Sequence, residues 1–385
     1  MNEKVGIATY MNNYNYGSIL QAYSLMTFIK NLGYDVYVLN FLDMNCRHNK
    51  KMRVKLYKNK FLFGIKNPKI LLSEIERRKK IKKEKKFISS QKISVFKNFQ
   101  EKYLRFSKLN YTENKTFSAF ICGSDQIWKL TTLGLHYFFF LQFAVPEKRI
   151  AYAPSFGSDF LPDYNKKQFK KYVSSFAAIS VREKSGVNII KKELGIEVPQ
   201  VLDPVFLLGR EYWCKLLNNS ARSMNEAILK NDQYVLCYFL NENAKGLEIV
   251  SKIENALKIK KIWIESGVAA FKNAQECCPT PFEFVNLIKN AAYVVTDSFH
   301  GVAFSCMMNT NFYVVKRNYT SSPEQNTRIQ SILEMLHLQS RIIENPADIE
   351  FEKIDFIKVN SILEVEREKS SDFLSTALKD TIKHE

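Results

Sequence analysis

A turn between two apolar stretches holds side chains that could act together on an anion. The sequence TDSFHG, residues 296–301, follows the apolar run Ala291–Val295 and precedes the apolar stretch Val302–Met308. We expect a buried strand before this turn and a buried helix after it. Asp297 or Ser298 can cap that helix, whose first N–H groups then offer a site for a phosphate or a carboxylate.

His300 lies in the same turn and is one of only five histidines in the chain. Beside a bound phosphate, an imidazolium can act as the general acid that protonates the leaving group. The same residue could instead serve only as part of the helix cap. We interpret His300 as a candidate catalytic residue.

Three further polar turns follow expected strands in the same way. They are residues 12–17 after KVGIAT, residues 123–128 after SAFIC, and Arg182–Glu183 after AAISV. Ligands bind beyond the carboxyl ends of strands in open parallel sheets, so these turns together favour a functional site. Asn, Asp and Ser also stabilise turns for purely structural reasons, and each residue alone is weak evidence.

Arginine side chains in these turns indicate recognition of an anion, because the guanidinium fork can grip two oxygens at once. Arg182 directly follows an expected strand and should project into the cleft. Arg328 lies in the first turns of an expected helix that follows the polar loop 318–327. Either residue could also be an ordinary surface arginine.

Other residues of these turns suit a sugar acceptor. Asp125 can hold or deprotonate a hydroxyl group, and Trp128 can stack on a sugar ring, although core packing explains Trp128 equally well. The expected acceptor-binding residues are Asn15, Tyr16, Gly17, Gln21, Ser124, Gln126 and Trp128.

The elements that position these residues alternate between strand and helix in two successive halves. This order predicts an α/β fold of two Rossmann-like domains whose parallel sheets face a cleft. We expect an N-terminal, acceptor-side domain over residues 1–204 and a C-terminal, donor-binding domain over 205–345. A helical tail, residues 346–385, should pack back on the first domain.

Composition narrows the class of protein. The chain has 385 residues, of which 46% are hydrophobic and 25% charged, and this composition predicts a soluble protein of two domains. No signal peptide or membrane-spanning stretch is apparent, and the seven cysteines form no C-x-x-C pair. We therefore expect a cytoplasmic protein without a metal site or cofactor. The absence of a G-x-G-x-x-G or Walker motif argues against dinucleotide binding and P-loop chemistry.

The net charge of +18 comes from one segment. Residues 47–115 contain 23 Lys and Arg against 5 Asp and Glu, whereas the rest of the chain contains 34 of each sign. We expect this segment to be an insertion outside both sheets. It could be a solvated helical surface, or it could attract anionic lipid head groups at the inner face of the cell membrane or an acidic glycan. No nucleic-acid recognition module accompanies the charge, so we expect no nucleic-acid partner.

Five sequence motifs, in order, resemble the polysaccharide pyruvyl transferase family. They are NYGSILQAYSL, ICGSDQIW, SVREKSG, VLDPVFLL and TDSFHGVAFS, and the resemblance extends over about residues 5–338, apart from the basic segment. It implies a GT-B-like fold. It also implies transfer of a pyruvyl group from phosphoenolpyruvate, the donor substrate, to two hydroxyls of a sugar as a cyclic ketal. The acceptor would be a sugar or lipid-linked oligosaccharide.

By position in these motifs, Arg182 and His300 would contact the phosphate and carboxylate of the donor, with the backbone of Phe299 and Gly301 beside them. Some branches of the family carry an arginine two residues before the histidine, where this chain has Ser298. The resemblance then leaves Arg328 and Lys316 as candidates to supply the missing contact.

Two other functions compete with pyruvyl transfer. A GT-B-like glycosyltransferase would use a nucleotide-sugar donor and needs a carboxylate to hold the ribose, for which Glu324 is the only candidate. A non-catalytic protein could bind glycans or membranes through the basic segment.

Overall fold

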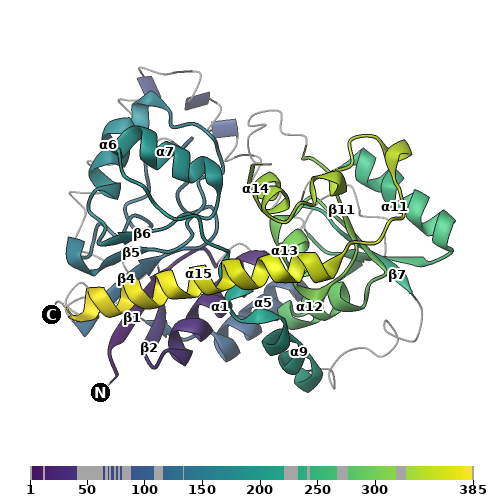
Figure 1. Ribbon diagram of the computed structural model, residues 1–385, viewed down its shortest axis with the longest axis horizontal. Coiled ribbons are helices and arrows are strands. Elements are labelled where there is room, and N and C mark those ends of the chain that lie inside the picture. Colours follow the sequence, from purple (N-terminus) through teal and green to yellow (C-terminus); the bar gives the residue numbers. More distant parts are fainter. Residues whose placement is uncertain are drawn as a thin grey trace.

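The computed structural model has two lobes, each built on a parallel β-sheet flanked by helices (Figure 1). A long C-terminal helix, α15 (Phe356–Lys383), runs across both lobes. The structure describes residues 2–11, 14–40, 64–65, 68, 71–72, 75–76, 79, 88–107, 116–132, 134–220, 233–240, 243–266, 276–317 and 327–383.

The sheet of the first lobe has the strand order β3-β2-β1-β4-β5-β6, and all of its pairs are parallel. This is the order of a Rossmann fold, in which the connections reverse direction between β1 and β4. The central strand is apolar on both faces because helices cover both, and Val5 lies opposite Val36 and Ala119. The strands are β1 (Lys4–Ala8), β2 (Asp35–Leu39), β3 (Phe106–Ser107), β4 (Ala119–Cys122), β5 (Arg149–Ala151) and β6 (Ala178–Ile179).

Helices connect these strands and begin near their carboxyl ends. They are α1 (Tyr16–Asn31), α5 (Ser90–Tyr103), the 3₁₀ turn η3 (Pro146–Lys148), α6 (Asp163–Val173) and α7 (Lys184–Leu194). Asn15 caps α1 by accepting a hydrogen bond from the Ser18 N–H at 3.1 Å. Gly195 ends α7 with a φ of 72°, a left-handed conformation that glycine adopts at low cost.

The sheet of the second lobe has the order β11-β10-β7-β8-β9 and is also entirely parallel. Its strands are β7 (Tyr234–Tyr238), β8 (Lys260–Ile264), β9 (Glu276–Cys277), β10 (Tyr293–Thr296) and β11 (Phe312–Val314). Its helices are α11 (Ala244–Leu257), α12 (Pro281–Asn290), α13 (Phe299–Met308) and α14 (Thr327–Met335), with 3₁₀ turns η7 (Gln339–Arg341) and η8 (Pro346–Asp348). The structure thus confirms the predicted fold of two Rossmann-like domains with parallel sheets.

One apolar cluster extends across both lobes, and each lobe also has a separate cluster of its own. The chain passes between them through α8 (Pro204–Leu207) and α9 (Gly209–Ser220), and α1 contacts both α12 and α13 of the second lobe. The Tyr16 ring of α1 stacks on Phe284 of α12, with ring centroids 4.6 Å apart. Helix α15 contacts β4, β5 and α13, and it buries Leu374 and Leu378 completely. The helices α1 and α15 therefore contact both lobes and connect them.

The basic segment is not wholly an insertion, and this corrects the prediction for residues 47–115. Its C-terminal part forms α5, whose Phe96 and Phe99 are buried, and β3, in which Phe106 pairs with Val38 of β2. Because the two phenylalanines repeat at helical spacing, they anchor α5 in the apolar core despite the surrounding lysines. Most of residues 47–87, including the centre of the charge, lies outside the described residues.

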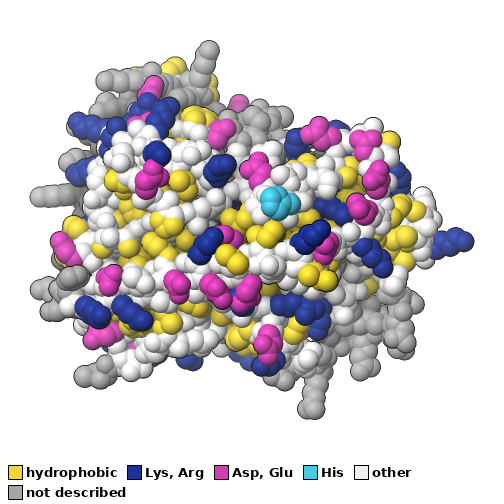
Figure 2. Space-filling view, viewed as in Figure 1, with side chains coloured by type: hydrophobic (Ala, Val, Ile, Leu, Met, Phe, Trp, Pro, Cys, Tyr) yellow, Lys and Arg dark blue, Asp and Glu magenta, His cyan; other side chains and the backbone are white. Residues whose placement is uncertain are grey.

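The surface seen in Figure 2 carries cationic and anionic side chains interspersed along α15 and both lobes. This distribution agrees with the equal numbers of charges outside residues 47–115. Within the described ranges, no helix is long and apolar enough to cross a membrane.

Candidate active site

The turn after β10 opens helix α13 without a side-chain cap. Ser298 occupies the N-cap position, but its side chain makes no capping hydrogen bond, so the predicted cap is wrong for Ser298. Asp297 instead ties neighbouring segments together: its Oδ1 accepts from the Leu240 N–H at 2.7 Å, and its Oδ2 lies 3.3 Å from Arg317 Nε. The first turn of α13 is nevertheless buried. A positive helix end therefore faces the protein interior with no capping side chain at its N-cap.

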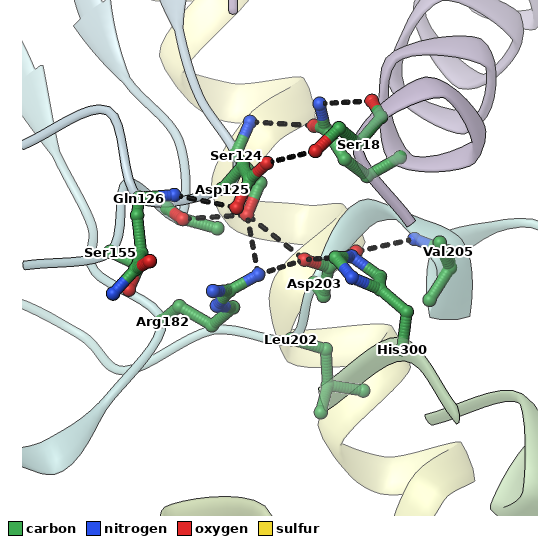
Figure 3. A network of polar contacts seen from close by, with 12 residues as sticks. Ser18, Ser124, Asp125, Gln126, Ser155, Arg182, Leu202, Asp203, Val205 and His300 are labelled. Atoms are coloured by element: carbon green, nitrogen blue, oxygen red, sulfur yellow. Dashed lines mark hydrogen bonds and ion pairs between the residues drawn. The ribbon is translucent and has the colours of Figure 1, made fainter. Parts of the chain in front are cut away.

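His300 projects from this turn toward the N-terminal ends of α1 and α8 (Figure 3). Its side chain is buried, and its Nε2 lies 3.6 Å from Asp203 Oδ2. On the other side, the ring packs against Gly17 in the first turn of α1. A Cβ atom at Gly17 would come within 1.9 Å of His300 Nδ1, so only glycine leaves room for the ring. Because α1 and α13 belong to different lobes, His300 lies at the boundary between the lobes.

Asp203 is a buried carboxylate at the centre of this arrangement. The sequence motifs contain it, but we did not predict it as a site residue. Its Oδ1 caps α8 by accepting from the Val205 N–H at 3.1 Å. Its Oδ2 accepts from Ser124 Oγ at 3.1 Å and from Arg182 Nη1. Burial raises the pKa of the carboxyl, but the contacts with His300 and Arg182 outweigh burial and hold the pKa well below 3.8. The sequence signal was an acidic residue directly before a proline that starts a helix.

One edge of the Arg182 guanidinium group makes no hydrogen bond, although its Nε lies 3.9 Å from Glu183 Oε2. Its Nη1 donates to Asp203, whereas Nε and Nη2 have no hydrogen-bond partner in the part of the chain that the structure describes. These two N–H groups share one edge of the planar fork and can bind both oxygens of a carboxylate or phosphate. The guanidinium carbon lies 4.2 Å from the centre of the Phe299 ring, which fixes the plane of the fork.

A cavity of about 10 Å³ lies beside this arginine, with room for about one water molecule. Residues of both lobes line it, among them Arg182 and Asp203 from the first and Phe299 and Arg328 from the second. Arg328 is buried and lines the same cavity as Arg182. Lys316 does not join them, because its exposed amine forms an ion pair with Glu344 at the surface.

Glu183 is a second buried carboxylate that sequence reasoning noted only as part of a turn. Its Oε1 accepts from Ser155 Oγ at 3.0 Å, from the Phe156 N–H at 2.6 Å and from the Gly157 N–H at 3.3 Å. Its Oε2 lies 3.9 Å from Arg182 Nε. Arg182 is therefore held between two carboxylates, of Asp203 and Glu183.

Asp125 lies in a strained turn after β4. Its φ is 68°, a left-handed value that costs a non-glycine residue energy and that aims its carboxylate back toward α1. Oδ2 accepts from Ser18 Oγ at 2.5 Å, and Oδ1 accepts from the Gln126 N–H at 2.8 Å. Burial raises the pKa of this carboxyl, but the electrostatic interactions with His300 and Arg182 lower it below the ordinary value. Asp125 thus shares one electrostatic environment with both residues.

Several expected acceptor residues hold this turn in place. Gln21 Oε1 accepts from the Ser124 N–H at 2.9 Å, and Gln21 Nε2 donates to Thr9 Oγ1 at 2.8 Å. Ser124 Oγ is directed to Ala153 O at 2.8 Å and to Asp203. Asn15 caps α1. These side chains hold the turn of Asp125 and the start of α1 in place through hydrogen bonds within the protein.

Two aromatic residues expected at an acceptor pocket belong to the core, which corrects both predictions. Trp128 is completely buried; its Nε1 donates to Phe139 O at 2.9 Å, and its ring stacks on Phe140. Tyr16 is also buried, and its OH donates to Pro279 O at 2.9 Å across the lobe boundary. An indole or phenol ring covered on its faces cannot stack on a sugar.

Gln126 differs from the other acceptor candidates, because its buried Nε2 has no hydrogen-bond partner among the described residues. The amide lies against Gly157, where a Cβ atom would come within 1.9 Å of Nε2. Of the acceptor residues, Gln126 therefore keeps a donor for a ligand. Glu324, the candidate ribose ligand of a glycosyltransferase, lies outside the described residues.

The fold and this site define an α/β protein of two Rossmann-like lobes with buried ionisable side chains at their boundary. The family model for polysaccharide pyruvyl transferase matches residues 15–319, which is most of the chain. The protein therefore belongs to the polysaccharide pyruvyl transferase family.

Several solved structures align with most of this chain at low sequence identity. The UDP-GlcNAc 2-epimerase from Neisseria meningitidis is 9% identical, with 89% of this chain and 95% of that chain covered and a TM-score of 0.42. The glycosyltransferase SnogD from Streptomyces nogalater is 9% identical, with 98% of each chain covered and a TM-score of 0.44. The wall teichoic acid polymerase TagF is 11% identical, with 99% of this chain and 89% of that chain covered and a TM-score of 0.45. No curated protein matches the chain.

Proposed function

We propose that the protein transfers a pyruvyl group from phosphoenolpyruvate to a sugar of a surface or capsular polysaccharide precursor, forming a ketal. One observation carries the proposal: the buried, uncapped start of α13 holds His300 within 3.6 Å of Asp203, which also binds Arg182, an arginine with a free bidentate edge. A donor with two anionic groups suits a site that offers a helix N-terminus and an arginine fork side by side.

The two anionic groups of the donor would bind to different parts of the site. The Nε and Nη2 edge of Arg182 would hold one group, and the first turn of α13 with Arg328 would hold the other. The cavity of about 10 Å³ is too small for the donor. We therefore expect the lobes to separate on donor entry and to close around the bound anion.

Two bond-forming steps at C2 of the donor complete the reaction. In the first, an acceptor hydroxyl oxygen bonds to C2, its proton leaves to a base, and the double bond takes a proton at C3. In the second, another hydroxyl of the same sugar bonds to C2 and loses its proton, and inorganic phosphate departs. Asp125 is the candidate to hold or deprotonate the acceptor, and His300 is the candidate acid for the leaving phosphate.

The proposed acceptor is a lipid-linked oligosaccharide at the inner face of the cell membrane. The excess of Lys and Arg in residues 47–115 supports this location, because basic segments bind anionic lipid surfaces. Co-sedimentation with phosphatidylglycerol vesicles tests it, with a variant lacking residues 75–87 as the control. Binding that is absent, or unchanged by the deletion, would remove the membrane from the proposal.

Donor binding and turnover test the function itself. Phosphoenolpyruvate should raise the thermal midpoint of the protein, whereas UDP-sugars should not. The protein should also release phosphate from phosphoenolpyruvate with p-nitrophenyl hexosides that carry free 4- and 6-hydroxyls, and His300→Asn should lower the rate about 10²–10⁴-fold. Stabilisation by a UDP-sugar alone would favour a glycosyltransferase. Stabilisation by neither ligand would favour a non-catalytic binding protein.

A further inference from the structure

The side chain of Asp203 is held by contacts beyond its ion pair with Arg182. Its side chain is completely buried, and its Oδ1 is tied to the Val205 N–H at the start of α8. Pro204 follows directly and restricts the backbone of Asp203 to an extended conformation. The second oxygen, Oδ2, therefore has a fixed position and direction.

That second oxygen accepts from Ser124 Oγ at 3.1 Å and also faces two ionisable residues from opposite lobes. Arg182, in the first lobe, donates to it through Nη1, and His300, in the second lobe, approaches it with Nε2 at 3.6 Å (Figure 3). His300 Nε2 has no hydrogen-bond partner among the described residues, and the side chain is more than nine-tenths buried. The other ring nitrogen, Nδ1, lies on the side of Gly17 and the first turn of α1.

We propose that Asp203 is a positioning residue that holds the ring of His300 in one orientation and keeps the proton of its neutral form on Nε2. A carboxylate beside one imidazole nitrogen stabilises the N–H form of that nitrogen and so sets the tautomer of the ring. Asp203 also occupies Nη1 of Arg182, so the free edge of the fork is the one formed by Nε and Nη2. One carboxylate thereby orients the candidate acid and the candidate donor clamp. This assignment of roles rests on the proposed function, whereas the tautomer of His300 does not.

The tautomer is measurable without any substrate. In protein labelled with ¹⁵N-histidine, only five residues contribute, and His300→Asn identifies the His300 signals. We expect the neutral ring of the wild type to carry its proton on Nε2, and we expect Asp203→Asn to shift the population toward the Nδ1–H form. A wild-type ring protonated on Nδ1 would overturn the proposal, even if the variant failed to fold.

Turnover supplies the second measurement. Asp203→Asn should lower kcat for phosphate release about 10²-fold or more, with a smaller effect on KM for phosphoenolpyruvate. The matched control is Glu265→Gln, which alters another buried carboxylate at the lobe boundary, bonded to Ser89 at 2.7 Å and 2.9 Å. That control should keep the wild-type kcat and His300 tautomer.

The two proposals fail in different ways. A wild type that releases no phosphate from phosphoenolpyruvate would defeat the proposed function, while the ¹⁵N spectra would still decide the role of Asp203. An active wild type with an equally active Asp203→Asn variant and an unchanged His300 spectrum would defeat the positioning role and leave the function standing.

Discussion

Replacing Gly17 with alanine adds one methyl group where the imidazole of His300 packs against α1. The new Cβ would lie 1.9 Å from Nδ1 and 2.1 Å from Cγ of the ring. Carbon atoms in contact lie about 3.5 Å apart, so the ring or the helix must retreat by roughly 1.5 Å. Misplacing a reacting group by about 1 Å can cost about 10²-fold in rate. We therefore expect Gly17→Ala to lower the rate of phosphate release by about 10²-fold.

The fold should survive this change. Overpacking costs about 1–3 kcal/mol, and alanine recovers about 1 kcal/mol over glycine within a helix, so the free energy of unfolding should fall by about 0–2 kcal/mol. Urea unfolding followed by circular dichroism measures this term, and the phosphate-release assay measures the rate. A large loss of rate with a small loss of stability is the expected signature.

Gly186→Ala is the matched control, because Gly186 lies in the first turn of α7 and its Cβ would approach Val181 only to 3.3 Å. We expect this variant to keep its activity. Wild-type turnover in Gly17→Ala would refute the reasoning, since it would mean that the reaction does not need His300 in its place against α1.

Three further perturbations have definite expected outcomes. Arg182→Lys should abolish most of the thermal stabilisation by phosphoenolpyruvate, because an ammonium group cannot replace the planar fork; equal stabilisation would count against Arg182 as the donor clamp. Asp203 and Asp125 both have a pKa below the ordinary 3.8 in the folded state, so the stability they contribute is present above about pH 4 and lost as the pH falls further. Acid unfolding of Asp203→Asn should accordingly depend less steeply on pH than that of the wild type. Trp128→Ala should lower the free energy of unfolding by about 3–5 kcal/mol, as for a core residue, and an unchanged stability with a raised acceptor KM would return Trp128 to the acceptor site.

The sequence predicted the elements that bring the candidate site together. Apolar runs such as those before Asp125, Arg182 and His300 indicated buried parallel strands, and the carboxyl ends of such strands open on one side of a sheet. The structure places these three residues in one electrostatic environment. Arg328 lines the same cavity as Arg182, a neighbourhood that the sequence alone did not predict.

The sequence was a poorer guide to what each polar or aromatic side chain contacts. Nothing in the motif ICGSDQIW distinguishes a Trp128 that faces a ligand from one that stacks on Phe140 in the core. Likewise, the many lysines of residues 47–115 led us to predict an insertion. Two phenylalanines at helical spacing nevertheless place α5 in the core. Side-chain direction depends on neighbours far away in the sequence, and local patterns do not contain them.

Local patterns of apolar and polar residues thus determined, by themselves, the α/β class, the two halves and the turns where chemistry could occur. Only the tertiary structure decided that Asp203 contacts Arg182 and His300. Arg182 lies 21 residues earlier in the chain, and His300 lies in the other lobe. The physical reason lies in the different ranges of the forces. Hydrogen-bonded periodicity and burial act over a few neighbouring residues, whereas a buried charge must find its partner wherever the fold brings one within reach.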